Sequence, residues 1–406
     1  MDKSLKIKFQ KNTKIFKKNV LVRVDLNVPV VEGKITDLTK IYSLKETLLN
    51  LIQNENKIFL LSHFGRPRGV FKKELSLQNI VNEIKNVFKL NKLYFVKDYL
   101  GNEIQNTINL MNNGEVCLLE NIRFHEEEEN NIESFAKKLS YNFDVYINDA
   151  FSSSHRSHSS IVGVTKFLPS YAGLMFEKEI NALNSILNTS NKPALGIIGG
   201  SKVSTKITIL ENLVKKLDYL VIAGGMANTF LASKSIDVGL SKVEEKYFNL
   251  IKNIKSNALK SGCKIILPID VVTSKSLNDK NSVYETSVEK IKKNYIAFDI
   301  GSKSCKEIIK LFSEVKTVLW NGPLGAFEYE PFDNSTKIIS KNLSIVSKKK
   351  QLNVVIGGGD TVSSISNLGV IEDFSYVSTS GGAFLEWLEG KELPGIHSLK
   401  HNQLFL

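Results

Sequence analysis

The segment ALGIIGGSKVSTK, residues 194–206, is the stretch from which the fold can be read. Ala194–Ile198 is a short apolar run typical of a buried strand, and Gly199-Gly200 follows it as a tight turn. A helical pattern covers Thr205–Leu217, and Tyr219–Ala223 predicts the next strand. A strand, a glycine turn, a helix and a second strand make the unit from which parallel sheets covered by helices are built.

The same alternation extends over the rest of the chain. Helical patterns lie over residues 38–52 and 77–88 in the first half, and over 173–187 between the halves. We therefore expect an α/β protein with two domains of similar architecture that meet near residues 170–190. The other expected strands are Val20–Val24, Ile58–Leu61, Val116–Leu119, Val145–Ile147, Lys264–Leu267, Val315–Leu319 and Asn353–Ile356.

Length and composition exclude several classes of protein. The chain has 406 residues, of which 42% are hydrophobic, so it can bury a large core without disulfides or structural metal. Cys117, Cys263 and Cys305 lie far apart without zinc-ligand spacing, which fits a reducing cytosol. No apolar run approaches the ~20 residues that span a bilayer. No secretory signal is visible at the start, so we expect a cytoplasmic protein without membrane attachment.

The formal net charge of +12 raises the question of nucleic-acid binding. The lysines are scattered, often beside Asn or Ile, and no run of five or six basic residues occurs. Because A/T-rich codons encode all three residues, we interpret most of this charge as solvated surface lysine. A basic nucleic-acid binder remains an alternative, which would show steeply salt-dependent binding.

Glycine turns gather in the second half of the chain. They are Gly199-Gly200, Gly224-Gly225, Gly357-Gly358-Gly359 and Gly381-Gly382, and each follows an apolar run. Glycines at the carboxyl end of a parallel strand let backbone amides approach an anion. The alternative is a set of ordinary tight turns, but four in one domain favour a phosphate-bearing ligand.

Two lysines follow the first of these turns. Lys202 and Lys206 are four residues apart, so we expect them on one face of the first helical turn. Cations at a helix N-terminus oppose the helix dipole, which ligand phosphates would offset. Solvated lysines are the alternative.

Arginine and histidine residues follow expected strands in the first half. His63 and Arg66 lie in SHFGRPR, Arg123 in LENIRFH, and His155 and Arg156 in DAFSSSHRSH. In a chain that uses lysine almost everywhere, retained arginine suggests the planar fork that grips phosphate or carboxylate. Surface ion pairs, or metal binding by the histidines, are alternatives; a small polyanionic substrate explains the set better. Residues 126–129, all glutamate, are most simply a solvated acidic loop.

The segment RVDLNVP, residues 23–29, places Asp25 and Asn27 on one edge of the first strand. These side chains could bind a substrate hydroxyl group, or could cap a turn.

Taken together, and in their order along the sequence, these segments resemble the phosphoglycerate kinase family over nearly the whole chain. The motifs that carry the resemblance are RVDLNVP (23–29), HFGRP (63–67), LLENIRF (118–124), NDAFSSSHRSH (148–158), GGSKVSTK (199–206), GGMANTF (224–230), LPIDVV (267–272), WNGPLGAFE (320–328), GGGDT (357–361) and LEGKELPG (388–395).

The resemblance implies an α/β fold with two Rossmann-like three-layer αβα domains, whose parallel sheets are separated by a cleft and hinge. It places the 3-phosphoglycerate and 1,3-bisphosphoglycerate domain at residues 1–170 and the nucleotide domain at 171–389. Residues 171–188 would form an interdomain helix, and the tail, 390–406, would pack back on the first domain.

The resemblance also implies roles for individual residues. The glycerate substrate would be bound by Asp25, Asn27, Lys40, His63, Arg66, Arg123, His155 and Arg156. The nucleotide would be bound by Lys202, Lys206, Asn321, Glu328, Gly357, Gly358, Gly359, Asp360 and Thr361, with Asp360 as the Mg²⁺ ligand and Glu328 at the ribose. The residues acting on the transferring group would be Lys40, Lys202, Gly359 and Gly382.

The implied reaction is reversible phosphoryl transfer from 1,3-bisphosphoglycerate to MgADP in glycolysis, giving 3-phosphoglycerate and MgATP. The acceptor in the reverse direction is a carboxylate, already ionised at neutral pH, so no general base is needed. Positioning and charge neutralisation would carry catalysis. Small-molecule substrates and a monomer are implied, with no nucleic acid as the primary partner.

One departure from the family lies at Lys40, where arginine is usual. Lysine keeps the charge but loses the bidentate fork, so we expect weaker stabilisation of the transferring group. A catalytically weakened member retained for binding is therefore an alternative to an active enzyme.

Overall fold

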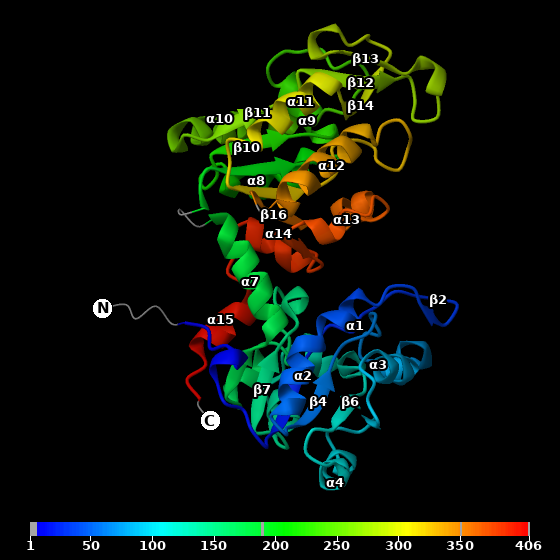
Figure 1. The fold of residues 1–406 in the computed structure, drawn as a ribbon, viewed down its shortest axis with the longest axis vertical. Coiled ribbons are helices and arrows are strands. Elements are labelled where there is room, and N and C mark those ends of the chain that lie inside the picture. The colour runs from blue at the N-terminus through cyan, green and yellow to red at the C-terminus, as the bar shows by residue number, and fades with distance from the viewer. Residues whose placement is uncertain (1–5, 188–190, 350, 405–406) are drawn as a thin grey trace. The chain divides into compact units, whose positions relative to one another are not determined.

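The computed structural model describes residues 6–187, 191–349 and 351–404, and Figure 1 shows the course of the chain. The chain divides into two compact units. Unit 1 comprises Met1–Ile180 and Glu392–Leu406, and unit 2 comprises Asn181–Lys391. The division falls within helix α7, Leu174–Leu187.

Unit 1 is built on a six-stranded parallel sheet in the order β5-β6-β4-β1-β7-β8. Strand β1 lies at the middle, with Val22 opposite Leu60 of β4 on one side and Ile147 of β7 on the other. The strands are β1 (Asn19–Arg23), β4 (Lys57–Leu61), β5 (Leu93–Val96), β6 (Val116–Leu119), β7 (Val145–Asn148) and β8 (Ser170–Ala172), and a hairpin joins β2 (Val30–Val31) to β3 (Lys34–Ile35).

Helices cover both faces of this sheet because alternate side chains of its strands point to opposite sides. Val20 and Val22 pack with Leu48 of α2 in one core, whereas Leu21 packs with Ile104 of α4 in the other. The helices are α1 (Thr39–Ser43), α2 (Lys45–Gln53), α3 (Val81–Val87), α4 (Asn102–Leu110), α5 (Glu126–Glu129), α6 (Glu133–Ser140) and α15 (Pro394–His401).

The end of the chain belongs to unit 1. The Gly395 N–H donates to the Ser154 carbonyl at 2.8 Å, and the Asn402 amide donates to the carbonyls of Thr165 and Leu168 at 2.6 and 3.0 Å. These bonds join α15 and the residue after it to the segment that follows β7.

Unit 2 contains a second six-stranded parallel sheet, in the order β11-β10-β9-β15-β16-β17. Its core packs Ile197 and Trp320 against Ile308 of α11 and Ile339 of α12. The strands are β9 (Ala194–Ile198), β10 (Tyr219–Ile222), β11 (Lys264–Ile266), β15 (Thr317–Asn321), β16 (Asn353–Gly357) and β17 (Tyr376–Ser378). The helices are α8 (Ile207–Leu213), α9 (Gly225–Ala232), α10 (Phe248–Ser261), α11 (Ser302–Leu311), α12 (Asn334–Lys348), α13 (Gly359–Ser366) and α14 (Gly382–Leu388).

The α/β class and the parallel sheets are confirmed. Sequence reasoning missed the edge strands β5, β8 and β17 and a separate antiparallel sheet, β13-β12-β14, formed by β12 (Asp270–Ser274), β13 (Tyr284–Ser287) and β14 (Ile296–Ile300). Strands β8 and β17 have three residues each, and β13 alternates between half-buried and exposed residues, so these three strands carry little apolar pattern. The helix expected over residues 38–52 is two helices that meet at Leu44.

None of the helices in the described part of the chain could span a lipid bilayer, since each is too short or too polar.

Candidate active site

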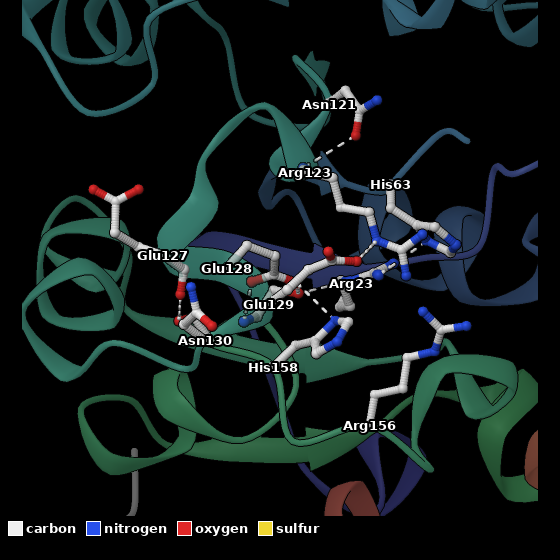
Figure 2. Close-up of polar contacts among 12 residues, drawn as sticks. Arg23, His63, Asn121, Arg123, Glu127, Glu128, Glu129, Asn130, Arg156 and His158 are labelled. Atoms are coloured by element: carbon white, nitrogen blue, oxygen red, sulfur yellow. Dashed lines mark hydrogen bonds and ion pairs between the residues drawn. The ribbon is translucent and has the colours of Figure 1, made fainter. Parts of the chain in front are cut away.

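All arginines of the chain lie within its first 156 residues: Arg23, Arg66, Arg68, Arg123 and Arg156. The parallel sheet of unit 1 brings three of them together with two histidines. We call Arg23, His63, Arg123, Arg156 and His158 the basic cluster (Figure 2). Each comes from the carboxyl end of a strand or from the segment after it, where parallel sheets bind ligands.

Arg23 ends strand β1, and its guanidinium group is fully buried. Its Nε donates to Ser160 Oγ at 2.9 Å, Nη1 donates to the Val24 carbonyl, and Nη2 donates to His63 Nδ1 at 3.1 Å. Each nitrogen of this side chain therefore has an acceptor, which fixes the orientation of the guanidinium plane.

His63 directly follows β4 and is 7% exposed. Burial, together with the positive charge of Arg23, holds the pKa of this imidazole well below its usual range, so the ring is neutral. Because Arg23 can only donate, Nδ1 accepts, and the single ring proton lies on Nε2. His63 is thus a neutral hydrogen-bond donor at Nε2.

Asn121 holds the two loops that carry His63 and Arg123. Its Oδ1 accepts from the N–H groups of Phe64 and Arg123, both at 3.1 Å, and its Nδ2 donates to the Phe64 carbonyl at 2.7 Å. Arg123 Nη1 donates to the Gly65 carbonyl at 2.8 Å. These bonds fix the loop after β4 against the loop after β6.

The remaining predicted residues of this set differ in burial. Arg123 is 3% exposed, and burial together with the nearby charge of Arg156 lowers its pKa to about 10. Arg156 is half-buried, and its Nε donates to His155 Nε2 at 3.3 Å. Arg66 is exposed. Repulsion between Arg123 and Arg156 is relieved when an anion binds near them, so these groups suit a phosphate or carboxylate.

Asp25, Asn27 and Lys40 form a second group beside His63. Lys40 Nζ lies 2.8 Å from Asp25 Oδ2 and donates to the Asn27 carbonyl at 3.1 Å. Ser152 Oγ donates to Asp25 Oδ2 at 2.5 Å, and Asn27 Oδ1 accepts from the Gly65 N–H at 2.9 Å. Lys40 is therefore already engaged by a carboxylate.

The Asp25 carboxyl group is largely desolvated. Burial by itself would raise its pKa, but the charge of Lys40 and the hydrogen bonds from Lys40 and Ser152 outweigh burial and hold the pKa well below its usual range. Asp25 is therefore an ionised acceptor, which suits a substrate hydroxyl group.

The expectation for residues 126–129 was wrong. They form α5, a single helical turn, and Glu128 is fully buried. Ser160 donates to its two oxygens, from N at 2.8 Å and from Oγ at 2.6 Å. Glu129 Oε1 lies 3.1 Å from Arg123 Nε. Buried cations require compensating charge, so this segment faces the basic cluster and is not simply solvated (Figure 2).

In unit 2, the four glycine turns all follow strands of one parallel sheet, at its carboxyl edge. Gly358 precedes α13 with φ +101°, a conformation that residues with a Cβ rarely adopt, and an added Cβ would lie 2.5 Å from Asn321 Nδ2. Helix α13 then begins at Gly359, so its first amides have no partner within the helix. This terminus suits a phosphate group.

Asn321 links several predicted nucleotide residues. It accepts a short hydrogen bond from Lys206 Nζ and donates from Nδ2 to the Gly357 carbonyl at 2.7 Å. Thr361 Oγ1 accepts from the Gly322 N–H at 2.6 Å and donates to the Gly357 carbonyl at 3.0 Å. The glycine turn after β16 is thus fixed from both sides.

The placement of Lys202 and Lys206 in one helical turn was wrong. Lys202 has extended backbone before a 3₁₀ turn, Val203–Thr205, and α8 begins only at Ile207. Lys202 is exposed, whereas Lys206 is half-buried, and burial lowers the pKa of Lys206 against the opposing effect of Asp360. Lys206, which donates to Asn321, is thus the more buried and the more firmly held of the two lysines.

Asp360, Glu328 and Gly382 are exposed. Asp360 lies in the first turn of α13, beside the glycine turn. Among the residues that the structure describes, no three His, Cys, Asp or Glu side chains converge as a protein-only metal cage. Mg²⁺ commonly uses one or two carboxylates and completes its shell with water and phosphate, so a single carboxylate fits a nucleotide-bound ion.

The family model described as "Phosphoglycerate kinase" matches residues 10–391. The chain belongs to the phosphoglycerate kinase family.

Known phosphoglycerate kinases align with this chain over nearly their full length. The phosphoglycerate kinase of Sinorhizobium medicae is 44% identical over 391 residues, covering 96% of this chain and 98% of the relative. That of Agrobacterium fabrum is 45% identical over 379 residues, covering 93% and 94%. The solved phosphoglycerate kinase of Coxiella burnetii has a TM-score of 0.90 at 34% identity, covering 97% of this chain and 99% of that one.

The function expected from sequence is thereby confirmed. As a phosphoglycerate kinase family member, the chain is a glycolytic phosphotransferase that interconverts 1,3-bisphosphoglycerate and ADP with 3-phosphoglycerate and ATP.

Sequence reasoning missed residues that hold the site of this phosphoglycerate kinase family member together. They are Arg23, Asn121, Ser152, Glu128 and Ser160. The sequence did contain a signal for Arg23. Arginine is rare in this lysine-rich chain, and the argument that such arginines are functional applies to Arg23 as well. The polar partners carried no such signal, since serine and glutamate are common on surfaces.

Proposed function

We propose that unit 1 binds the glycerate substrate at the basic cluster and that unit 2 binds the nucleotide at its glycine turns. The observation that carries this proposal is the gathering of Arg23, His63, Arg123 and Arg156 at the carboxyl edge of one sheet. A trianionic sugar-acid phosphate supplies the negative charge that such a cluster lacks.

Within unit 1, Asp25 accepts from a substrate hydroxyl group, because it is ionised and held by Ser152 and Lys40. His63 donates from Nε2, and Arg66, Arg123, His155 and Arg156 supply further donors to the carboxylate or phosphate. Lys40 holds the Asp25 and Asn27 segment and offers its remaining N–H to the transferring group.

Within unit 2, Lys202, Lys206 and the amides of Gly357, Gly358 and Gly359 bind nucleotide phosphates, supported by Asn321 and Thr361. Gly382, which begins α14, offers its amide to the transferring group, and Glu328 binds the ribose.

Mg²⁺ would be held by Asp360 together with nucleotide phosphate oxygens, and it supplies charge neutralisation when bound. The protein groups have the remaining tasks of holding both ligands and balancing the charge of the transferring group. The acceptor carboxylate is already ionised, so no residue has to remove a proton.

One chain supplies both sets of residues, which supports a monomer as the active form. All three cysteines are buried and free, which supports a reducing cytoplasm. Light scattering of the purified protein tests the first statement.

A coupled assay with 3-phosphoglycerate and MgATP tests the proposal. We expect saturable turnover, with the Arg123→Ala variant raising KM for 3-phosphoglycerate and the Lys206→Ala variant raising KM for ATP. No turnover by folded wild-type protein would refute an active enzyme and favour a weakened binding protein, the alternative that Lys40 suggests.

A further inference from the structure

The side chain of Glu128 lies among the residues of the basic cluster, beside Arg23 and His158 (Figure 2). It is 0% exposed, although it comes from a run of four glutamates of which the other three are exposed. Burying a carboxylate is unfavourable unless it is paired and hydrogen-bonded, so its position requires an explanation.

Glu128 is fixed by the segment that follows β7. Ser160 donates to its Oε2 from N and to its Oε1 from Oγ, and the Ser159 N–H donates to the Glu128 carbonyl at 2.9 Å. Ser159 Oγ also donates to the Glu127 carbonyl at 2.9 Å. Both carboxylate oxygens therefore accept hydrogen bonds from Ser160, which fixes the orientation of the carboxylate.

Ser160 connects this carboxylate to Arg23. Arg23 Nε can only donate, so Ser160 Oγ accepts from it and directs its own hydrogen to Glu128. The direction of both bonds is thus determined. Glu128 orients the hydroxyl group, and the oriented hydroxyl group holds one side of the guanidinium plane.

Arg23 in turn determines the proton position on His63. Its Nη2 donates to Nδ1, which leaves the proton of the neutral ring on Nε2. A chain of contacts therefore runs from Glu128 through Ser160 and Arg23 to His63, and every group in it is buried. Low local dielectric strengthens each of these bonds.

We propose that Glu128 is a positioning residue for glycerate binding, which acts through Ser160 and Arg23 to present His63 as an Nε2–H donor to the substrate. This inference rests on the proposed glycerate site in unit 1. It assigns a role in substrate binding to a buried glutamate that touches neither substrate.

The direction in which Glu128→Gln changes the affinity for 3-phosphoglycerate distinguishes a positioning role from simple charge balance. Replacing Glu128 with Gln removes a negative charge beside a site for anions. If Glu128 only offset the cluster's charge, 3-phosphoglycerate would bind more tightly. If Glu128 positions Arg23 and His63, binding weakens, because a charge-assisted hydrogen bond to the substrate is misaligned.

The experiment measures KM for 3-phosphoglycerate and for ATP in E128Q, with E127Q as the matched control. Glu127 lies in the same helical turn, but its side chain is exposed, so E127Q makes the same charge change outside the contact chain. We expect E128Q to raise KM for 3-phosphoglycerate roughly 5- to 20-fold, with KM for ATP unchanged and E127Q at the wild-type values. A lowered or unchanged KM for 3-phosphoglycerate in folded E128Q overturns the proposal.

A second variant, S160A, breaks the chain without changing any charge, and it serves if E128Q does not fold. We expect the same rise in KM for 3-phosphoglycerate. An unchanged KM in S160A overturns the proposal.

A spectroscopic measurement is independent of activity. Nitrogen-15 NMR of the His63 ring, assigned with H63Q, should show the Nε2–H tautomer in wild type and E127Q and a tautomer mixture in E128Q and S160A. An unchanged tautomer in both variants overturns the contact chain. Failure of the glycerate site itself is distinguishable, because H63Q would then leave KM for 3-phosphoglycerate unchanged while the tautomer still responds to E128Q.

Discussion

Lys40 is the position at which one substitution should improve this enzyme. Its ammonium group contacts Asp25 Oδ2 at 2.8 Å and the Asn27 carbonyl at 3.1 Å. An ammonium group has three N–H donors, so these contacts leave one for a ligand. Arginine has five donors in a planar fork, so Lys40→Arg can keep both contacts and offer two donors to the transferring phosphoryl group.

The expected gain is about one charge-assisted hydrogen bond in the transition state. Such a bond contributes about 1–3 kcal/mol, which corresponds to a roughly 5- to 150-fold increase in kcat/KM when chemistry limits the rate. The side chain of Lys40 is 28% exposed, and solvent screening places the expected value toward the lower end of that range.

The coupled assay should be run on wild type, Lys40→Arg and Lys40→Met at saturating MgATP. Lys45→Arg is the control, because Lys45 begins α2 and is exposed. We expect kcat/KM of Lys40→Arg to exceed that of wild type and kcat/KM of Lys40→Met to fall well below it. Lys45→Arg should have the wild-type value. Single-turnover measurements show whether product release hides a gain in chemistry.

Two results would refute this reasoning. Equal single-turnover rates for wild type, Lys40→Arg and Lys40→Met would show that the position does not contact the transferring group. A loss of rate in Lys40→Arg would show that the Asp25 pocket is shaped for an ammonium group, so the departure from the family is compensated locally.

Three further predictions concern other parts of the molecule. Burial raises the pKa of Asp149 to about 6, so the folded state binds this proton more tightly than the unfolded state. Relative to Asp149→Asn, wild type should therefore gain stability as pH falls from about 7 to about 4, by at most about 3 kcal/mol; urea unfolding that shows no pH-dependent difference would contradict this. Lys206→Met should raise KM for ATP roughly 10- to 150-fold, and more than Lys202→Met does, with KM for 3-phosphoglycerate unchanged; equal effects of the two variants would argue against the half-buried lysine as the main phosphate ligand. Gly358→Ala should destabilise unit 2 by about 1–3 kcal/mol, as seen by thermal unfolding, whereas Gly359→Ala should not, because its added methyl group meets no atom within 4 Å.

Most of the framework was predictable because it depends on local pattern. The apolar runs at Val20–Val24 and Ala194–Ile198 predicted β1 and β9 within one residue at either end. The glycine turns predicted the edge of the sheet at which phosphate groups can bind. The antiparallel sheet was missed because β13 is stabilised by its neighbours in the sheet and not by an apolar run of its own.

The acidic segment at residues 126–129 marks the limit of such reasoning. Four consecutive glutamates favour solvent by composition alone, yet Glu128 is buried because Ser160 and Arg23 lie beside it. Nothing within the segment distinguishes Glu128 from its neighbours. Its burial depends on partners that are 32 residues away for Ser160 and farther still for Arg23.

The amino-acid sequence by itself determined the α/β class, the glycine turns, the retained arginines and the family, since each depends on residue types in order along the chain. Only the tertiary structure decided which charges are buried, how Lys40 is engaged by Asp25, and which nitrogen of His63 carries the proton. The physical reason is that charge pairing and desolvation depend on distances between side chains. The parallel sheet of unit 1 sets those distances by joining residues as far apart as Arg23 and Ser160, which are separated by 137 positions.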